Sequence, residues 1–303
     1  MEAFQQTVNR LMKNNIQIEK TEKILVLTDR TTEKLAKKFN EALKKGGWTS
    51  TFYMMEDRSK SGEEPPKEAA ELMLRYRLVF CLTKHSLTHT VARKEANAKG
   101  VSVITMPGIT EDMFLQGAMS ADYSRVEEET IAMAEKLTAA KSVTILTGEA
   151  NKLVIPIKGR RGIASTGVFR ETSASGNLPS GEAYIAPMEG MAEGSIEING
   201  SIAGIGLLNE AITITIEQGK LIHATGEKGK KLLALLGEGQ GRMLAELGIG
   251  TNYKARLTGN ILEDEKAYHT VHVAFGSNHT FGGTIHADVH IDCVTKDPKL
   301  EWE

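Results

Sequence analysis

Histidines cluster near the C-terminal end of this 303-residue chain. Five of its eight histidines fall within 22 residues: His269, His272, His279, His286 and His290. The segment TIHADVHIDCV alternates strictly, as a strand with one buried face does, and its polar face carries His286, Asp288, His290 and Asp292. Two imidazoles and two carboxylates in register offer nitrogen and oxygen donors to a borderline metal ion. The segment therefore predicts a metal-binding strand; the alternative is an exposed edge strand.

The preceding segment KAYHTVHVAFG also alternates. His272 faces away from the apolar set, so it is a second candidate ligand. His269 lies on the apolar side and is predicted to be a structural, hydrogen-bonded histidine. His279 lies in a glycine-rich loop between the two strands, where a site residue could occupy the tip.

Three blocks together resemble a known family, the thermophilic leucyl-type metalloaminopeptidases that include aminopeptidases T and S. They are GNLPSGEAYIAP, with Glu182; LAELGIGTN, with Glu246; and HVAFGSN followed by HIDC, with His272, His290 and Asp292. The resemblance implies that these five residues are the ligands of a two-metal site, with Glu182 as the bridging carboxylate. It leaves open whether Glu246, on or just after a short helix, is a ligand, a base or both.

Three carboxylates and two imidazoles can hold two divalent ions about 3.5–4 Å apart. Such a pair suits peptide hydrolysis: one ion polarises the scissile carbonyl, a bridging water attacks, and the other ion holds the free α-amino group. The family resemblance therefore implies an aminopeptidase with Glu182 and Glu246 in catalysis, acting on short peptides with a free N-terminus. It also implies a homodimer. Zn, Co or Mn would each suit the ligand set.

One position departs from the family pattern. Seven residues after the first histidine the family usually has a tyrosine near the metals, and this chain has His279. His279 is accordingly a candidate catalytic residue, as an additional ligand or a proton donor, or a mark of changed chemistry.

Two other functions compete with hydrolysis. Gly276-Ser277-Asn278, Gly282-Gly283 and His290-x-Asp292 also resemble the iron-dependent dihydroxypyridine ring-cleaving dioxygenases, whose mononuclear Fe(II) site uses two histidines and one carboxylate. The position that resembles their other histidine is Glu246 here, which favours hydrolysis. The third possibility is a metal-stabilised binding protein without turnover, although structural zinc sites are usually closed and richer in cysteine.

The chain divides into two architectures. Only 6 of its 29 glycines lie in residues 1–143, where apolar runs at 23–28, 48–54, 78–83 and 101–106 alternate with helical patterns. This predicts a doubly wound, flavodoxin-like α/β domain with a parallel sheet. Residues 144–303 predict a mostly antiparallel α+β metal-binding domain with a helix at about 227–238 and a short helix in GQGRMLAELG. Ser124 and Glu127 have capping-box spacing and predict a helix start before a strand at 142–147.

Composition bounds the function further. The 37 basic and 39 acidic side chains leave a formal charge of −2, which gives no nucleic-acid footprint. Neither an apolar run of about 18 residues nor a signal-peptide pattern is evident, so no membrane association and a cytoplasmic location are expected. The two cysteines, Cys81 and Cys293, lie in separate apolar runs, which argues against a disulfide or a thiolate zinc site.

Overall fold

The computed structural model describes residues 2–303, and the chain forms two compact units. The parallel unit runs to Ser124 and includes residues 167–180, whereas the antiparallel unit consists of residues 125–166 and 181–303. The sequence predicted a single boundary at residue 143, and the two units depart from it in two places. Residues 125–143 belong to the antiparallel unit, and residues 167–180 return to the parallel unit, where they add a strand to its sheet.

The parallel unit is built on five strands in the order β2-β1-β3-β4-β8, all parallel. They are β1 (Lys23–Thr28), β2 (Thr49–Met54), β3 (Leu78–Leu82), β4 (Ser102–Thr105) and β8 (Ser175–Asn177). The helical segments are α1 (Glu2–Asn14), α2 (Glu33–Lys45), α3 (Lys67–Met73), α4 (Val91–Ala98), α5 (Glu111–Leu115) and η1 (Ala118–Ser120). The first four strands match the predicted runs, and β8 is an addition that the sequence did not indicate.

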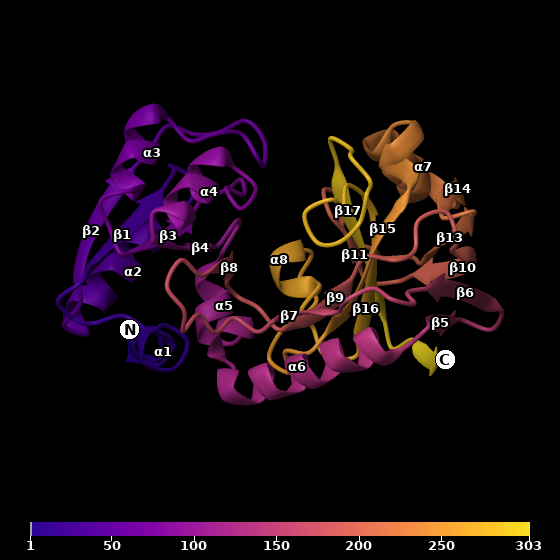
Figure 1. Ribbon diagram of the computed structural model, residues 1–303, viewed down its shortest axis with the longest axis horizontal. Helices are drawn as coiled ribbons and strands as arrows, with labels where there is room; N and C mark the ends of the chain where they lie inside the picture. The colour runs from indigo at the N-terminus through magenta and orange to yellow at the C-terminus, as the bar shows by residue number, and fades with distance from the viewer. Residues whose placement is uncertain (1) are drawn as a thin grey trace. The chain divides into compact units, whose positions relative to one another are not determined.

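Helices cover both faces of this sheet, as Figure 1 shows for the parallel unit. Leu25 and Leu27 of β1 pack in one buried cluster with Met73 of α3 and Ala96 of α4. On the opposite face the Phe80 ring of β3 meets Phe39 of α2 edge to face, with ring centroids 5.0 Å apart. Because successive side chains of a strand point to opposite faces, these fully apolar strands need cover on both sides. The predicted doubly wound α/β fold is confirmed.

The antiparallel unit has two sheets, ordered β14-β13-β10-β6-β5-β18 and β12-β11-β17-β16-β15-β9-β7. The first contains β5 (Ser142–Thr147), β6 (Asn151–Pro156), β10 (Glu193–Ile198), β13 (Ile212–Glu217), β14 (Lys220–Ala224) and β18 (Lys299–Trp302). The second contains β7 (Ile163–Ser165), β9 (Glu182–Ile185), β11 (Ser201–Ile202), β12 (Gly206–Leu207), β15 (Leu244–Gly250), β16 (Thr270–Gly276) and β17 (His290–Lys296). Their helical segments are α6 (Tyr123–Ala139), α7 (Gly226–Leu236), η2 (Gly239–Arg242) and α8 (Ile261–Asp264).

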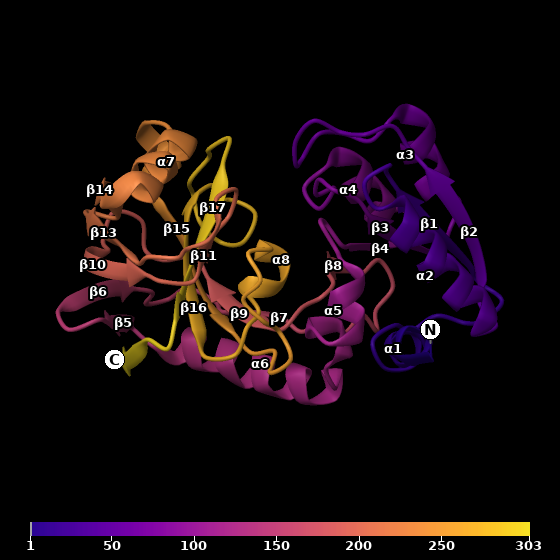
Figure 2. The same ribbon diagram turned by 180° about the vertical axis from the view of Figure 1, so that it is seen from behind.

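One hydrophobic core serves both sheets of the antiparallel unit. Ile145 of β5 and Ile214 of β13 belong to the same buried cluster as Leu247 of β15 and Val273 of β16. Helix α7 packs beside β13 and β14, which Figure 2 shows from behind. The predicted antiparallel character and the helix at about 227–238 are confirmed. Among the described helices, none is long and apolar enough to cross a membrane.

Three local predictions differ from the structure. The predicted short helix in GQGRMLAELG is a 3-10 turn, η2, followed by β15, whose seven residues are all buried between β16 and β9. The strand predicted from residue 284 begins only at His290, because pairing with β16 ends at the Gly276–His290 pair. Helix α6 begins at Tyr123, and the Asp122 carboxylate accepts from the Ser124 N–H, so the observed cap lies two residues before the predicted cap at Ser124.

Candidate metal centre

All five predicted ligands lie on four neighbouring strands of one sheet. Glu182 is on β9, Glu246 on β15, His272 on β16, and His290 and Asp292 are on β17. These strands are adjacent in the order β17-β16-β15-β9, all pairs antiparallel. Residues two positions apart on a strand face the same way, so β17 directs His290 and Asp292 to one side. Pairing of the strands thus brings together side chains that are far apart in sequence.

Glu246 lies between the two histidines. Its Oε1 is 3.2 Å from His272 Nε2, and its Oε2 is 3.5 Å from His290 Nε2. The side chain is only 9% exposed. Each carboxylate oxygen therefore faces a different imidazole.

His290 and Asp292 complete one side of the centre. His290 Nε2 is 3.5 Å from Asp292 Oδ1, and His290 Nδ1 is 2.9 Å from the Ser277 carbonyl oxygen. A carbonyl at Nδ1 fixes the imidazole so that Nε2 is the metal-facing nitrogen. Donor atoms of Glu246, His290 and Asp292 all lie within 4.8 Å of one another. Among residues 2–303, these three residues form a compact candidate cation site.

His272 and Glu182 form the other side. Glu182 Oε2 is 3.5 Å from His272 Nε2, so these two residues and Glu246 Oε1 converge. The His272 ring is fully buried, and no described residue provides a hydrogen-bond partner for its Nδ1. His272 therefore lacks the orienting contact that Ser277 gives His290.

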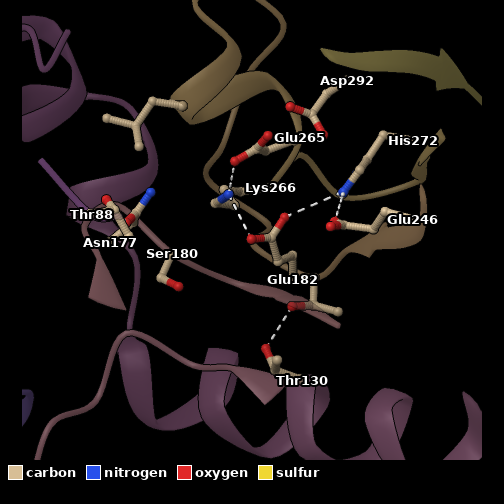
Figure 3. Close-up of polar contacts among 12 residues, drawn as sticks. Thr88, Thr130, Asn177, Ser180, Glu182, Glu246, Glu265, Lys266, His272 and Asp292 are labelled. Carbon is tan, nitrogen blue, oxygen red and sulfur yellow. Dashed lines mark hydrogen bonds and ion pairs between the residues drawn. The ribbon is translucent and has the colours of Figure 1, made fainter. Parts of the chain in front are cut away.

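Sequence reasoning missed two charged residues at the centre, Glu265 and Lys266. The Lys266 ammonium is 2.8 Å from Glu182 Oε1 and also contacts the Glu265 carboxylate, as Figure 3 shows. Its side chain is 1% exposed. The two residues follow the short helix α8 in the charged run EDEK, which is typical of a solvated surface. Their position at the centre is evident only from the burial of Lys266. Burial is rare for a lysine, and no local sequence pattern predicts it.

The charges of the centre favour a cation at its imidazole nitrogens. Burial would lower the pKa of His272, but its hydrogen bond with Glu246 and the charge of Glu182 raise that pKa to about 9. Burial likewise opposes a charged His290, yet Asp292 outweighs it and raises the pKa of His290 to about 10. In turn, His290 lowers the pKa of Asp292 to about 2 against the effect of burial. Carboxylates and imidazoles with this surplus of negative charge fit divalent metal ions.

Aromatic rings line one side of the centre. The Phe281 ring contacts the His290 ring edge-on, with centroids 5.9 Å apart, and contacts Tyr184 of β9 at 5.5 Å. Phe281 also lines a cavity of about 770 Å³ between α6 and β7. Phe281 therefore contacts both this cavity and the candidate ligand His290.

Four residues from the histidine-rich segment lie apart from this cluster. His279 is exposed; its Nδ1 is 2.8 Å from Ser277 Oγ, and its ring stacks on His286 with centroids 4.2 Å apart. His286 and Asp288 lie in a loop rather than on a ligand-bearing strand face, and Ser277 rather than either of them contacts His290 Nδ1. His269 was predicted to be a structural histidine on the apolar face; that prediction is wrong, because it is exposed in the turn before β16 with φ +61°.

Comparisons with known proteins bear on the whole chain. The family model described as thermophilic metalloprotease matches residues 109–290, more than half of the chain. A 2,5-dihydroxypyridine dioxygenase from Pseudomonas putida superposes with a TM-score of 0.80 at 16% identity, covering 98% of this chain and 93% of that chain. AmpT from Thermus thermophilus superposes with a TM-score of 0.71 at 17% identity, covering 99% and 95%. No curated protein gives a significant sequence match.

Proposed function

Because this chain belongs to the thermophilic metalloprotease family, we propose that it is a metal-dependent aminopeptidase that removes the N-terminal residue of short peptides at a two-metal centre. The observation that carries the proposal is the position of Glu246, with one carboxylate oxygen toward His272 and the other toward His290. The proposed ligands are the five residues predicted from the sequence: Glu182, Glu246, His272, His290 and Asp292.

The five ligands divide into two subsites. The His290 subsite consists of Glu246 Oε2, His290 and Asp292, and the His272 subsite consists of Glu246 Oε1, His272 and Glu182 Oε2. In this assignment Glu246, rather than Glu182, is the shared carboxylate, because Glu182 Oε1 is engaged by Lys266. The family resemblance had implied the opposite assignment.

Bound divalent ions would polarise the scissile carbonyl, lower the pKa of the attacking water and hold the free α-amino group of the peptide. The chain supplies the rest. Glu182 and Glu246 are the proposed catalytic carboxylates, because Glu246 faces both histidines and Glu182 Oε2 faces His272. His279 is the proposed proton donor to the leaving amine, from an exposed loop anchored at Ser277.

The cavity beside Phe281 is the proposed space for the substrate. Its wall combines apolar residues of α6 and β7, such as Ile131 and Ile163, with the exposed Arg161. The neighbouring Arg160 contacts the Glu189 carboxylate and the Gly282 carbonyl. Arg161 is therefore the better-placed cation for the carboxylate end of a short peptide.

The proposal is tested by hydrolysis with a defined metal content. Protein loaded with two equivalents of Zn, Co or Mn is expected to release the N-terminal residue from free di- and tripeptides. The same peptides with an acetylated N-terminus should stay intact, because the α-amino contact is lost. Absence of any amino acid release by the fully loaded protein would reject the aminopeptidase and leave two candidates, a metal-stabilised binding protein and the ring-cleaving dioxygenase.

A second candidate is a mononuclear Fe(II) ring-cleaving dioxygenase. It is favoured by the fold shared with 2,5-dihydroxypyridine dioxygenase and by the clustering of Glu246, His290 and Asp292, which could hold a single ion. This set has one histidine and two carboxylates, whereas a ring-cleaving Fe(II) site has two histidines and one carboxylate. This candidate is tested by measuring oxygen consumption with 2,5-dihydroxypyridine and protein that holds one ferrous ion. Oxygen consumption would favour the dioxygenase over the aminopeptidase.

A further inference from the structure

Lys266 places a permanent positive charge inside the proposed metal centre. Its ammonium lies 2.8 Å from Glu182 Oε1, contacts Glu265 and is shielded from solvent. A buried ammonium requires opposite charges at close range, and two carboxylates meet that requirement here. Glu182, however, is also a ligand of the His272 subsite, so one carboxylate serves two cations.

The two subsites differ in a second respect. In the His290 subsite, the Ser277 carbonyl holds His290 through Nδ1 and so orients Nε2. In the His272 subsite, the buried His272 Nδ1 has no hydrogen-bond partner among residues 2–303. Because such outer contacts typically raise metal affinity about 10–100-fold, the His272 subsite is the less well supported of the two.

We propose that Lys266 is a built-in counter-ion of Glu182 that makes the His272 subsite bind its divalent ion far more weakly than the His290 subsite. This inference rests on the two-subsite arrangement of the proposed function. The ammonium holds one oxygen of Glu182, neutralises part of its charge and repels an incoming divalent ion. The chain would therefore retain one ion firmly and exchange the other with the medium.

The unmodified protein provides the first test. Cobalt(II) is titrated into metal-free protein, and binding is followed by calorimetry, visible absorption and elemental analysis after gel filtration. Two stepwise dissociation constants separated by about 100-fold or more are expected from the missing outer contact and the added repulsion. Retention of close to one ion after gel filtration should accompany them. Two ions bound with equal affinity would overturn the inference.

Lys266→Met is the second test. Removing the ammonium should lower the larger of the two dissociation constants, that of the His272 subsite, by about tenfold or more. The smaller dissociation constant should change less. Lys254→Met removes the same charge from an exposed lysine of the same unit and should change neither constant. An unchanged weaker constant in folded Lys266→Met protein, verified by thermal unfolding, would overturn the inference.

Glu265→Gln offers a variant that retains the lysine. Without the Glu265 carboxylate, Lys266 interacts with Glu182 alone, and the metal ion should bind still more weakly at the His272 subsite. Tighter binding at the His272 subsite in this variant would contradict the role of Lys266. None of these measurements involves a peptide, so the inference and the aminopeptidase assignment can fail separately.

Discussion

Gly248 of β15 lies directly across from His272 of β16, and a Cβ atom at position 248 would be 2.0 Å from His272 Nε2. The imidazole therefore rests over a position of the neighbouring strand that carries no side chain. This steric relationship, rather than any backbone requirement, explains the glycine two residues after Glu246. The candidate ligand His272 is thus accommodated by the absence of a side chain at Gly248.

Gly248→Ala should displace His272. We expect overpacking to cost about 1–3 kcal/mol of unfolding free energy and to weaken the second metal-binding step. Denaturant unfolding of the metal-free protein measures the cost. The same substitution in a His272→Ala background should cost much less, since the clashing ring is gone. An equal cost in both backgrounds would show that the strain arises elsewhere.

Glu246→Gln should disable both subsites. Loss of outer contacts alone typically costs 10–100-fold in metal affinity or activity, so loss of a shared ligand should lower kcat/KM by at least about 100-fold. His290→Ala should instead remove only the tightly held ion. Elemental analysis and peptide hydrolysis distinguish the two variants, and Glu238→Gln, at an exposed glutamate paired with Arg242, is the matched control. Full metal content in Glu246→Gln would contradict its shared position.

Stability of the metal-free protein should fall at alkaline pH. The pKa of His272 is raised to about 9 and that of His290 to about 10, above the ordinary value of about 6.5. A raised folded-state pKa gives stability that is fully present below about pH 6.5 and is lost as pH rises through 9–10. Thermal unfolding in chelator between pH 6 and pH 10 measures the loss. His272→Ala should flatten this profile, whereas His223→Ala, at an exposed histidine, should not.

Added metal should reverse that trend. Metal binding competes with the protons on His272 and His290, so the metal-induced rise in Tm should increase as pH rises. The same scans with excess zinc measure this difference. A metal effect that is constant across the pH range would mean that neither histidine is a ligand.

His279→Ala should leave metal content unchanged, because His279 contacts Ser277 and His286 rather than the five ligands. If His279 donates the proton to the leaving amine, kcat should fall by about 100-fold or more. His286→Ala removes the stacking partner alone and should have a smaller effect. Loss of an ion in His279→Ala protein would instead assign His279 as a ligand.

The native thiols should resist alkylation. Burial raises the pKa of Cys81 to about 12 and also raises the pKa of Cys293, so little thiolate forms at pH 8. Cys81 lies in the parallel unit and Cys293 in the antiparallel unit, so each thiol reports the opening of one unit. Mass spectrometry after iodoacetamide treatment in increasing guanidinium measures both. Rapid alkylation without denaturant would show that the strands open readily.

The fold class could be predicted because the strands are long apolar runs. Strands β1, β3 and β4 are buried on both faces, and continuous apolar sequence between helices is typical of a parallel sheet. The strand around Glu246 was harder to predict, because Leu244, Ala245 and Leu247 are good helix formers. Complete burial between two partner strands outweighs that local preference.

The five candidate ligands were identified from the sequence, but their surroundings were not. Alternation in residues 284–294 predicted one long strand, yet residues 284–289 have no register with β16, so His286 and Asp288 lie in a loop. Lys266 was missed because its neighbours in sequence are charged, and its burial depends on β9, a strand far away in the chain. Contacts between distant segments leave no periodic signal to find.

The position of the ligands on adjacent strands has a consequence for folding. Strands β9, β15, β16 and β17 come from separate stretches of the chain, and their hydrogen bonds run only between immediate neighbours. An ion bound to side chains from several of them acts as a cross-link over the top of the sheet, closing loops that the unfolded chain would otherwise sample freely. Metal binding would then stabilise this sheet against local unfolding, in addition to supporting catalysis. Hydrogen exchange in these strands would slow when the metal binds.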